Sequence, residues 1–340
     1  MSHPLPGPVR VAASTRSGLF TSADLAAAGV TEAEVRSAVR SGAWVRLRRG
    51  SFVTAADLAL LEADGRRHEL DVRVVTTALA RPGAALSHGT AARLWRLPLP
   101  VGLAPEVRLV DPHRWRSGPG YMMVRAELPD AEVTEVGGHR VTTAARTLVD
   151  TAREWSELPA VAALDAALLR GLVTPEELRG TLDRHRYAPR LPRAVRAVAA
   201  ADGRAESWLE TKGRLCFRAA GLPPFVPQVE LWVDGELVKV ADGWYEDAAL
   251  AVEFAGRVKY VRPAYGGRPE DVLFDEELRE DLLRSVGVRF VRIVDEHLGP
   301  GWAPVEARLR RELASQGRAI RAFRAVPRDV GRVCASSRRA

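Results

Sequence analysis

The stretch that decides the fold at the start of this chain is FTSADLAAAGVTEAEVRSAVRSGAWVRLRRGSFV, residues 20–53. It predicts two short helices, because Gly29 ends the first and Thr31 with Glu34 forms the capping box that begins the second. Residues 44–53 then alternate apolar and basic side chains around the turn sequence RRG, which is typical of a β-hairpin. Helix, turn, helix and basic hairpin in this order predict a winged helix-turn-helix.

Arginines gather on the parts of this predicted module that would face a ligand. Arg36 and Arg40 lie four residues apart on the second helix, opposite its apolar stripe, and Arg46, Arg48 and Arg49 lie on the hairpin. We expect these side chains to bind DNA, since a recognition helix and its wing meet base edges and phosphates in this way. The alternative is a small helical domain with a solvated basic surface.

The composition supports a polyanionic partner. The chain has 340 residues, a formal net charge of +7 and a pI near 10.0, and such a charge favours association with nucleic acid. Nearly all of the positive charge is arginine, because Lys212, Lys239 and Lys259 are the only lysines. With 46% apolar residues, no apolar run of membrane-spanning length and two cysteines, the sequence predicts a cytoplasmic protein with no membrane partner.

The length and the pattern of elements predict an α/β multidomain protein. We expect a flexible N-terminus, a winged helix-turn-helix, a mixed α+β middle region, a C-terminal αβββαβ domain, and a basic helix with a disordered tail, over residues 1–17, 18–55, 56–191, 192–300 and 301–340. The long helix between the last two strands of the C-terminal domain implies a parallel crossover.

The middle region carries polar residues without an evident catalytic partner. Asp150 and Asp165 lie in apolar surroundings, and we expect them to cap helices or to form hydrogen bonds between helices. Ser87 precedes His88, and no third member of a catalytic triad is evident, so Ser87 is interpreted as a helix N-cap. The sequence of the middle region therefore predicts no catalytic site.

Acids lie on three predicted elements of the C-terminal domain. Glu253 lies inside the apolar strand of ALAVEFAGRVKY, residues 249–260; Glu210 lies in the opening helix, and Asp242 lies just past the second strand. Asp242 and Glu253 can converge at one sheet edge, where carboxylates, waters and a substrate phosphate would hold Mg²⁺. Lys259 would stabilise charge on the phosphate or help to deprotonate a water. The alternative is that Glu253 lies on a solvent-facing side of its strand and that Asp242 is an ordinary turn residue.

This domain resembles the PD-(D/E)XK superfamily of restriction-endonuclease-like proteins, in the version related to the very-short-patch-repair nuclease and the domain of unknown function 559. The motifs are ESWLETKGRL, AAGLPPFVPQVEL, VADGWYEDAALAVEFAGRVKY and EELREDLLRSVGVRFVRI. The resemblance implies a Mg²⁺-dependent endonuclease with Glu210, Asp242 and Glu253 as its acids and Lys259 as its basic residue. The superfamily's usual lysine, two residues after the central acid, is Ala255 in this chain.

The front of the chain resembles the AbiEi-like type IV antitoxins over about residues 18–180. Besides the winged-helix stretch, the resemblance is carried by LSHGTAARLWRLPLP, GGHRVTTAARTLVD and LDAALLRGLV. In that family the winged helix is similar to an operator-binding autorepressor, and a downstream region opposes a nucleotidyltransferase toxin. The resemblance implies duplex DNA and a cognate toxin as partners.

Three functions follow from these features. The first is a DNA-binding protein with a winged-helix targeting module and a nuclease-like domain that uses Mg²⁺ for phosphodiester hydrolysis if its site is active. The second is an AbiEi-type antitoxin and transcriptional autorepressor whose nuclease-like domain is inactive. The third is an interaction module that opposes a toxin through protein contacts alone.

Overall fold

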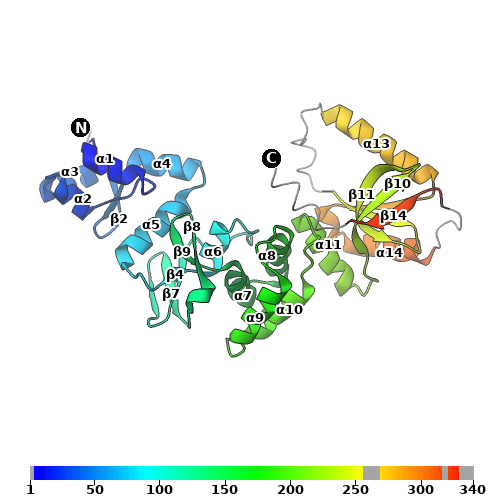
Figure 1. Cartoon of the computed structure of the whole chain (residues 1–340). Helices are drawn as coiled ribbons and strands as arrows, with labels where there is room; N and C mark the ends of the chain where they lie inside the picture. Colours follow the sequence, from blue (N-terminus) through cyan, green and yellow to red (C-terminus); the bar gives the residue numbers. More distant parts are fainter. Residues whose placement is uncertain (1–3, 256–268, 316–320, 329–340) are drawn as a thin grey trace. The chain divides into compact units, whose positions relative to one another are not determined.

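The computed structural model of the chain describes residues 4–255, 269–315 and 321–328, without the side chains of residues 269–274. The chain divides into two compact units (Figure 1). The first consists of Met1–Trp95 with Val101–Thr143, and the second of Arg96–Pro100 with Ala144–Ala340. The predicted middle region, residues 56–191, is divided between the two units: its strands belong to the first and its last helices to the second.

The first unit begins with the predicted winged helix-turn-helix. Its elements are α1 (Gly7–Ser14), β1 (Phe20–Thr21), α2 (Ser22–Ala27), α3 (Glu32–Arg40), β2 (Trp44–Arg48) and β3 (Ser51–Thr54). The strands form an antiparallel sheet in the order β1-β3-β2. Thr21 and Thr31 each form a complete capping box, so α2 and α3 begin where the sequence predicts.

The N-terminus differs from the flexible segment predicted over residues 1–17. Helix α1 buries Val9 and Ala13 in one apolar cluster with Phe20 and Trp44. The sequence did not predict this helix because the segment begins with prolines, which usually interrupt helices. Proline is, however, well tolerated in the first turn of a helix. The winged helix therefore has a third helix that closes its core.

A six-stranded sheet and its helices complete the first unit. These are α4 (Ala55–Ala63), α5 (Arg67–Leu79), β4 (Ala85–Leu86), α6 (His88–Leu94), β5 (Val107–Asp111), β6 (Arg116–Gly118), β7 (Tyr121–Arg125), β8 (Val133–Val136) and β9 (His139–Thr142), with strand order β6-β7-β5-β4-β9-β8. Helix α5 belongs to two cores: Leu70 and Val74 pack with the winged helix, and Val72 and Val75 pack with the larger sheet.

Ser87 precedes α6, as its interpretation as an N-cap requires, but its side chain makes no capping hydrogen bond. The Ser87 hydroxyl instead lies 2.9 Å from Nδ1 of His88, and both residues are buried. The Ser87 hydroxyl is thus hydrogen-bonded to the imidazole of His88 and not to the backbone of α6.

The second unit starts with four packed helices, α7 (Ala144–Glu154), α8 (Glu157–Leu169), α9 (Pro175–Arg184) and α10 (Leu191–Ala200). Because α10 packs against α7, α8 and α9, the helical group crosses the boundary predicted at residue 192. The buried carboxylate of Asp165, on α8, accepts hydrogen bonds from the Asp202 backbone, the Thr211 hydroxyl and Arg214, at 2.6, 2.7 and 2.6 Å. This confirms its predicted role between helices, since Thr211 and Arg214 lie in α11 (Trp208–Ala219).

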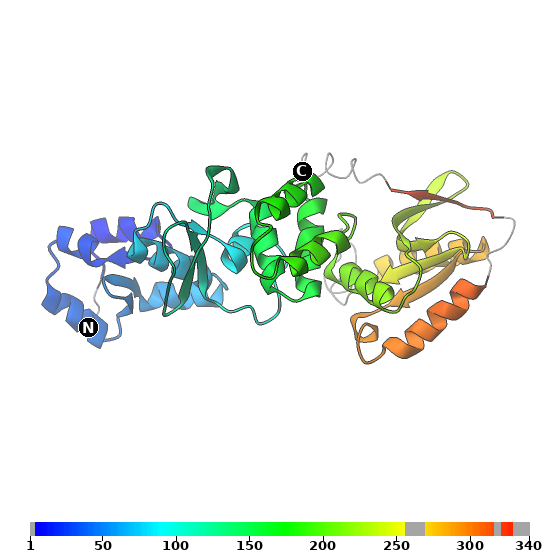
Figure 2. The same ribbon diagram turned by 90° about the horizontal axis from the view of Figure 1, so that it is seen from below.

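The C-terminal sheet follows the predicted order of helix, three strands, helix and strand. Its elements are α11 (Trp208–Ala219), β10 (Val226–Val233), β11 (Glu236–Tyr245), β12 (Leu250–Phe254), α13 (Pro269–Ser285), β13 (Arg289–Ile293), α14 (Trp302–Ala314) and β14 (Arg324–Pro327). The strand order is β13-β12-β11-β10-β14, and β12 and β13 are parallel, as the crossover predicts. Helices α11 and α14 cover one face of this sheet, and α13 covers the other (Figures 1 and 2).

Two segments of this sheet differ from the prediction. Strand β14 lies within residues 301–340, for which the sequence predicts only a basic helix and a tail, and it pairs antiparallel with β10. Strand β11 continues to Tyr245, so Asp242 lies inside the strand rather than past its end. The amphipathic pattern of α13 predicts Leu278, Leu282 and Leu283 on its inner side, but only Leu283 of these three is buried, whereas Leu278 and Leu282 are exposed. The buried side of α13 also carries a carboxylate, because Glu280 is buried as well.

Candidate functional site

Helix α3 presents two arginines to solvent. Its Ala38 is buried, whereas Arg36 and Arg40 are exposed, as the amphipathic pattern predicts. Arg36 pairs with Glu32 at 3.1 Å, and the side chains of this pair are 59% and 92% exposed. An exposed pair of this kind contributes little stability, so a phosphate can replace Glu32 at small cost.

The three arginines of the β2–β3 hairpin have different surroundings. The guanidinium of Arg46 lies 5.4 Å from the ring centroid of Phe52, and Arg49 is exposed at the turn. Arg48 is half-buried: its guanidinium lies 4.9 Å from the ring centroid of Tyr121 and donates to the backbone oxygen of Pro119. Arg48 therefore attaches the wing to the β6–β7 hairpin, and its contact with DNA stays a prediction.

In the second unit, the three predicted acids lie on neighbouring elements. Asp242 of β11 precedes the register pair Gly243 and Val252, and its Oδ2 accepts from the backbone N–H of Phe254 at 2.7 Å. This bond ties Asp242 to the end of β12, directly beside Glu253. On α11, Glu210 is buried, and its Oε2 accepts from the backbone N–H of Glu206 at 2.9 Å.

The charges of these acids influence one another. Burial, followed by the charge of Asp242, raises the pKa of Glu210 to about 7. Burial raises the pKa of Glu253 to about 8, where Lys239 opposes the shift and Asp242 adds to it. Because Asp242 acts on both glutamates, the three carboxylates form one electrostatic cluster. Acidic side chains with strongly shifted pKa values occur more often at functional sites than elsewhere.

The basic residue that meets the cluster is Lys239 of β11. Its Nζ lies 3.4 Å from Oε2 of Glu253, and also 3.3 Å and 3.5 Å from Glu276 and Glu280 of α13. Burial lowers the pKa of Lys239, and the three glutamates overcome this effect and raise it above the usual value. Predicted site residue Lys259 lies outside the described residues.

The cluster has the donors that a divalent cation prefers. Oε1 of Glu253 is buried and has no hydrogen-bond partner, and a buried carboxylate oxygen of this kind is expensive to leave unsatisfied. Mg²⁺ commonly binds one or two carboxylates and keeps several waters, so Asp242 and Glu253 fit such a site. Within the described part of the chain, however, no three His, Cys, Asp or Glu side chains form a ligand set for a metal ion.

Two residues of this cluster were missed by the sequence analysis. Gln228 of β10 is buried, and its backbone has the left-handed conformation, with φ of 54°. Its Nε2 donates a hydrogen bond to Glu210 at 3.1 Å. Nothing in the sequence marks Gln228. The scarcity of lysine could have drawn attention to Lys239, because lysine is used at only three positions in this arginine-rich chain.

Comparison with known proteins supports the N-terminal prediction. The sequence model of a family described as "Transcriptional regulator, AbiEi antitoxin" matches residues 9–55. The matched segment contains most of α1, both helices of the helix-turn-helix and the wing.

Two proteins of Mycobacterium tuberculosis are similar to this chain over most of its length. They are "Uncharacterized protein MT2308" and "Uncharacterized protein Rv2248", from two strains of Mycobacterium tuberculosis, and each is 28% identical over 288 residues, covering 84% of this chain and 97% of the relative. The crystal structure of the RV2827C protein from Mycobacterium tuberculosis matches with a TM-score of 0.36 and 16% identity, over 59% of this chain and 84% of that one. Among the described residues, no helix is long and apolar enough to cross a membrane.

Proposed function

We propose that this protein is a DNA-binding transcriptional regulator of the AbiEi antitoxin kind, which binds duplex DNA through α3 and the β2–β3 hairpin. The observation that carries the proposal is the pair of exposed arginines, Arg36 and Arg40, on the second helix of a helix-turn-helix that matches this family. Arg46 and Arg49 extend the basic surface along the wing. A net charge of +7 supports the same partner, since phosphate contacts supply most of the affinity of such modules.

The test is DNA binding by the full chain, measured by fluorescence anisotropy on random duplex and on the DNA upstream of its own coding sequence. Replacing Arg36 and Arg40 by glutamine is expected to weaken binding roughly tenfold or more and to reduce the salt slope by about two. Arg179→Gln is the matched control, because Arg179 is also exposed and paired with an acid on a surface helix. Equal affinities for the double variant and the control would refute the proposal.

The resemblance to antitoxins adds a protein partner to this proposal. A nucleotidyltransferase toxin would form a stable complex with this chain, and co-purification of the chain with the product of a neighbouring gene is the test. A toxin that neither co-purifies nor loses activity in the presence of this chain would leave only the DNA-binding part of the proposal.

The carboxylate cluster favours a second candidate function, Mg²⁺-dependent cleavage of DNA by a restriction-endonuclease-like domain. The αβββαβ order and the unsatisfied Oε1 of Glu253 support it. Asp242 and Glu253 would hold the cation, which would polarise a phosphate and activate a water. Glu210 and Lys239 would set the charge around that site, because Glu210 shares the field of Asp242 and Lys239 pairs with Glu253.

Supercoiled DNA incubated with the protein and Mg²⁺ or Mn²⁺, against EDTA, separates the two functions. Metal-dependent nicking that is lost in Glu253→Gln would support the nuclease. A second measurement does not need activity: Mn²⁺ should raise the melting temperature of the wild-type protein, but not that of the variant. Retarded DNA without nicking, and no effect of Mn²⁺ on melting, would assign the cluster no metal and leave DNA binding as the function.

A further inference from the structure

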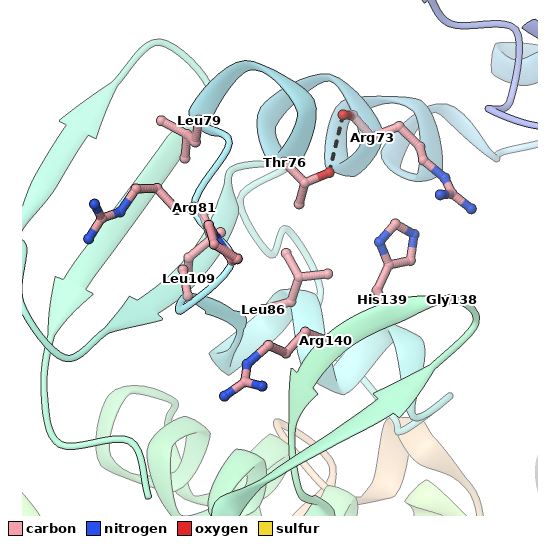
Figure 3. Close-up of a pocket in the computed structure, with 11 residues that line it drawn as sticks. Arg73, Thr76, Leu79, Arg81, Leu86, Leu109, Gly138, His139 and Arg140 are labelled. Carbon is pink, nitrogen blue, oxygen red and sulfur yellow. Dashed lines mark hydrogen bonds between the residues drawn. The ribbon is translucent and has the colours of Figure 1, made fainter. Parts of the chain in front are cut away.

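A pocket in the first unit has no role in either proposed function. It lies between helix α5 and the start of β9 and encloses about 230 Å³ (Figure 3). Arg73 of α5 and His139 of β9 lie beside each other, Leu86 and Leu109 form an apolar side, and Arg81 and Arg140 also line the pocket. It is therefore a small hollow with an arginine and a histidine at one end and aliphatic carbons next to them.

The tight turn before β9 places His139. Gly137 and Gly138 both have positive φ, 59° and 74°, and join the paired residues Val136 and His139. Two consecutive residues with positive φ are the pattern of a tight two-residue hairpin, which glycine makes without strain. The first residue of β9 thus lies below Arg73 of α5, as Figure 3 shows.

The arginines that line the pocket differ in their pairing with carboxylates. Arg81 is neutralised by the buried Asp111, at 3.0 and 2.9 Å. Arg140 pairs with the exposed Asp130 at 3.5 Å and lies opposite Glu135 of β8, and its guanidinium is directed away from Arg73 and His139 (Figure 3). Arg73 forms no ion pair with any described residue.

Two further acids face this region from neighbouring elements, and neither fills the pocket. Glu69, one turn before Arg73 on α5, is paired with Arg66 at 2.8 Å. Glu135 of β8 acts on His139 through space but forms no ion pair among the described residues. Burial, followed by the charge of Arg73, lowers the pKa of His139, and Glu135 acts in the opposite direction. The imidazole is therefore neutral near pH 7, and a bound anion would return its pKa towards the usual value.

We propose that this pocket binds the phosphate group of a small molecule, held by Arg73 and His139 with the body of the molecule against Leu86 and Leu109. The arginine fork matches an oxyanion, and a few placed polar groups beside apolar walls are the usual design of a ligand pocket. The volume is below that of sites for drug-sized ligands, which fits a small occupant. A phosphate of the DNA backbone has the same chemistry, but the pocket is a recess between helix and sheet, which suits a small molecule better than a duplex.

The experiment is NMR of the histidine rings in the full chain during a titration with inorganic phosphate, at constant ionic strength set with chloride. His139→Gln assigns the signal. The expected result is a saturable shift of the His139 ring protons together with a rise in its pKa. Arg73→Gln is expected to weaken phosphate binding about tenfold. Arg67→Gln is the matched control on the same helix, since Arg67 pairs with Glu62 and Asp71 outside the pocket.

Three results would overturn the proposal. The first is no saturable shift of His139 in the wild-type protein, for which His139→Gln serves only to assign the signal. The second is the same phosphate affinity in Arg73→Gln and Arg67→Gln; if Arg73→Gln does not fold, Arg73→Met takes its place. The third is displacement of phosphate from His139 by a short DNA duplex, which would assign the pocket to the DNA backbone instead of a small molecule.

Discussion

At the scale of single residues, Glu253 links the stability of the second unit to pH. With a pKa of about 8, its carboxyl keeps its proton in the folded protein at pH values where an unfolded glutamate has lost it. The folded state then binds more protons than the unfolded state between about pH 5 and pH 8. We expect the free energy of unfolding to fall across this window as pH rises, by on the order of 1–3 kcal/mol, in urea titrations.

Glu253→Gln should flatten this pH profile, because glutamine has no proton to lose. Glu236→Gln is the control, since Glu236 is an exposed position of the same sheet, and it should keep the wild-type profile. A wild-type stability that is constant from pH 5 to pH 8 would contradict the prediction. Glu210, with a pKa of about 7, contributes in the same direction and would account for the slope that remains in the variant.

Two helical glycines should respond to alanine with opposite signs. A Cβ at Gly213 of α11 would lie 2.0 Å from a ring carbon of Phe254, so Gly213→Ala should destabilise the protein by about 1–3 kcal/mol or more. A Cβ at Gly180 of α9 would meet only the end of the Arg184 side chain, at 3.4 Å. Gly180→Ala should stabilise the protein by about 0.5–1 kcal/mol, because glycine is a poor helix former. Urea unfolding of both variants checks the two signs.

At the scale of elements, the start of α3 supports the DNA-binding surface. Thr31→Ala removes the cap of α3 and should cost about 1 kcal/mol and weaken DNA binding, since the first turn loses its hydrogen bonds. Thr174→Ala is the matched control, because Thr174 forms the same capping box on α9. It should cost a similar free energy and leave DNA affinity unchanged in anisotropy measurements. Equal losses of DNA affinity in both variants would indicate general destabilisation instead.

The elements that the sequence predicted well carry their signals in adjacent residues. The capping box of Thr31 with Glu34 marked the start of α3. Asp234 with Gly235 is likewise a dipeptide typical of tight turns, and it joins β10 to β11 with positive φ at both residues. Strand β14 escaped prediction because its few residues are a strand only when they pair with β10. Local propensity does not contain that information.

The candidate site was predictable in part for the same reason. Glu253 stood out because an acid interrupted an apolar strand. Lys239 and Gln228 did not, since the side to which a strand residue points depends on register and irregularities of the sheet. The left-handed backbone of Gln228 is one such irregularity, and it lies where β10 faces Asp242.

At the scale of the whole molecule, the two units have separate cores. We therefore expect two transitions in differential scanning calorimetry of the full chain. Thr31→Ala should lower the melting temperature of one transition only, and Gly213→Ala that of the other, because the two residues belong to different units. A single transition that moves with both variants would show that the units unfold together.

Strand β14 has a consequence for the order in which this protein is made. The ribosome synthesises β14 after every other strand of its sheet, yet β14 pairs with β10, which is made first among them. Until then, the outer edge of β10 has backbone donors and acceptors that another chain could pair with. The most vulnerable moment for aggregation is therefore late in translation, when the sheet is otherwise complete and this edge is still open.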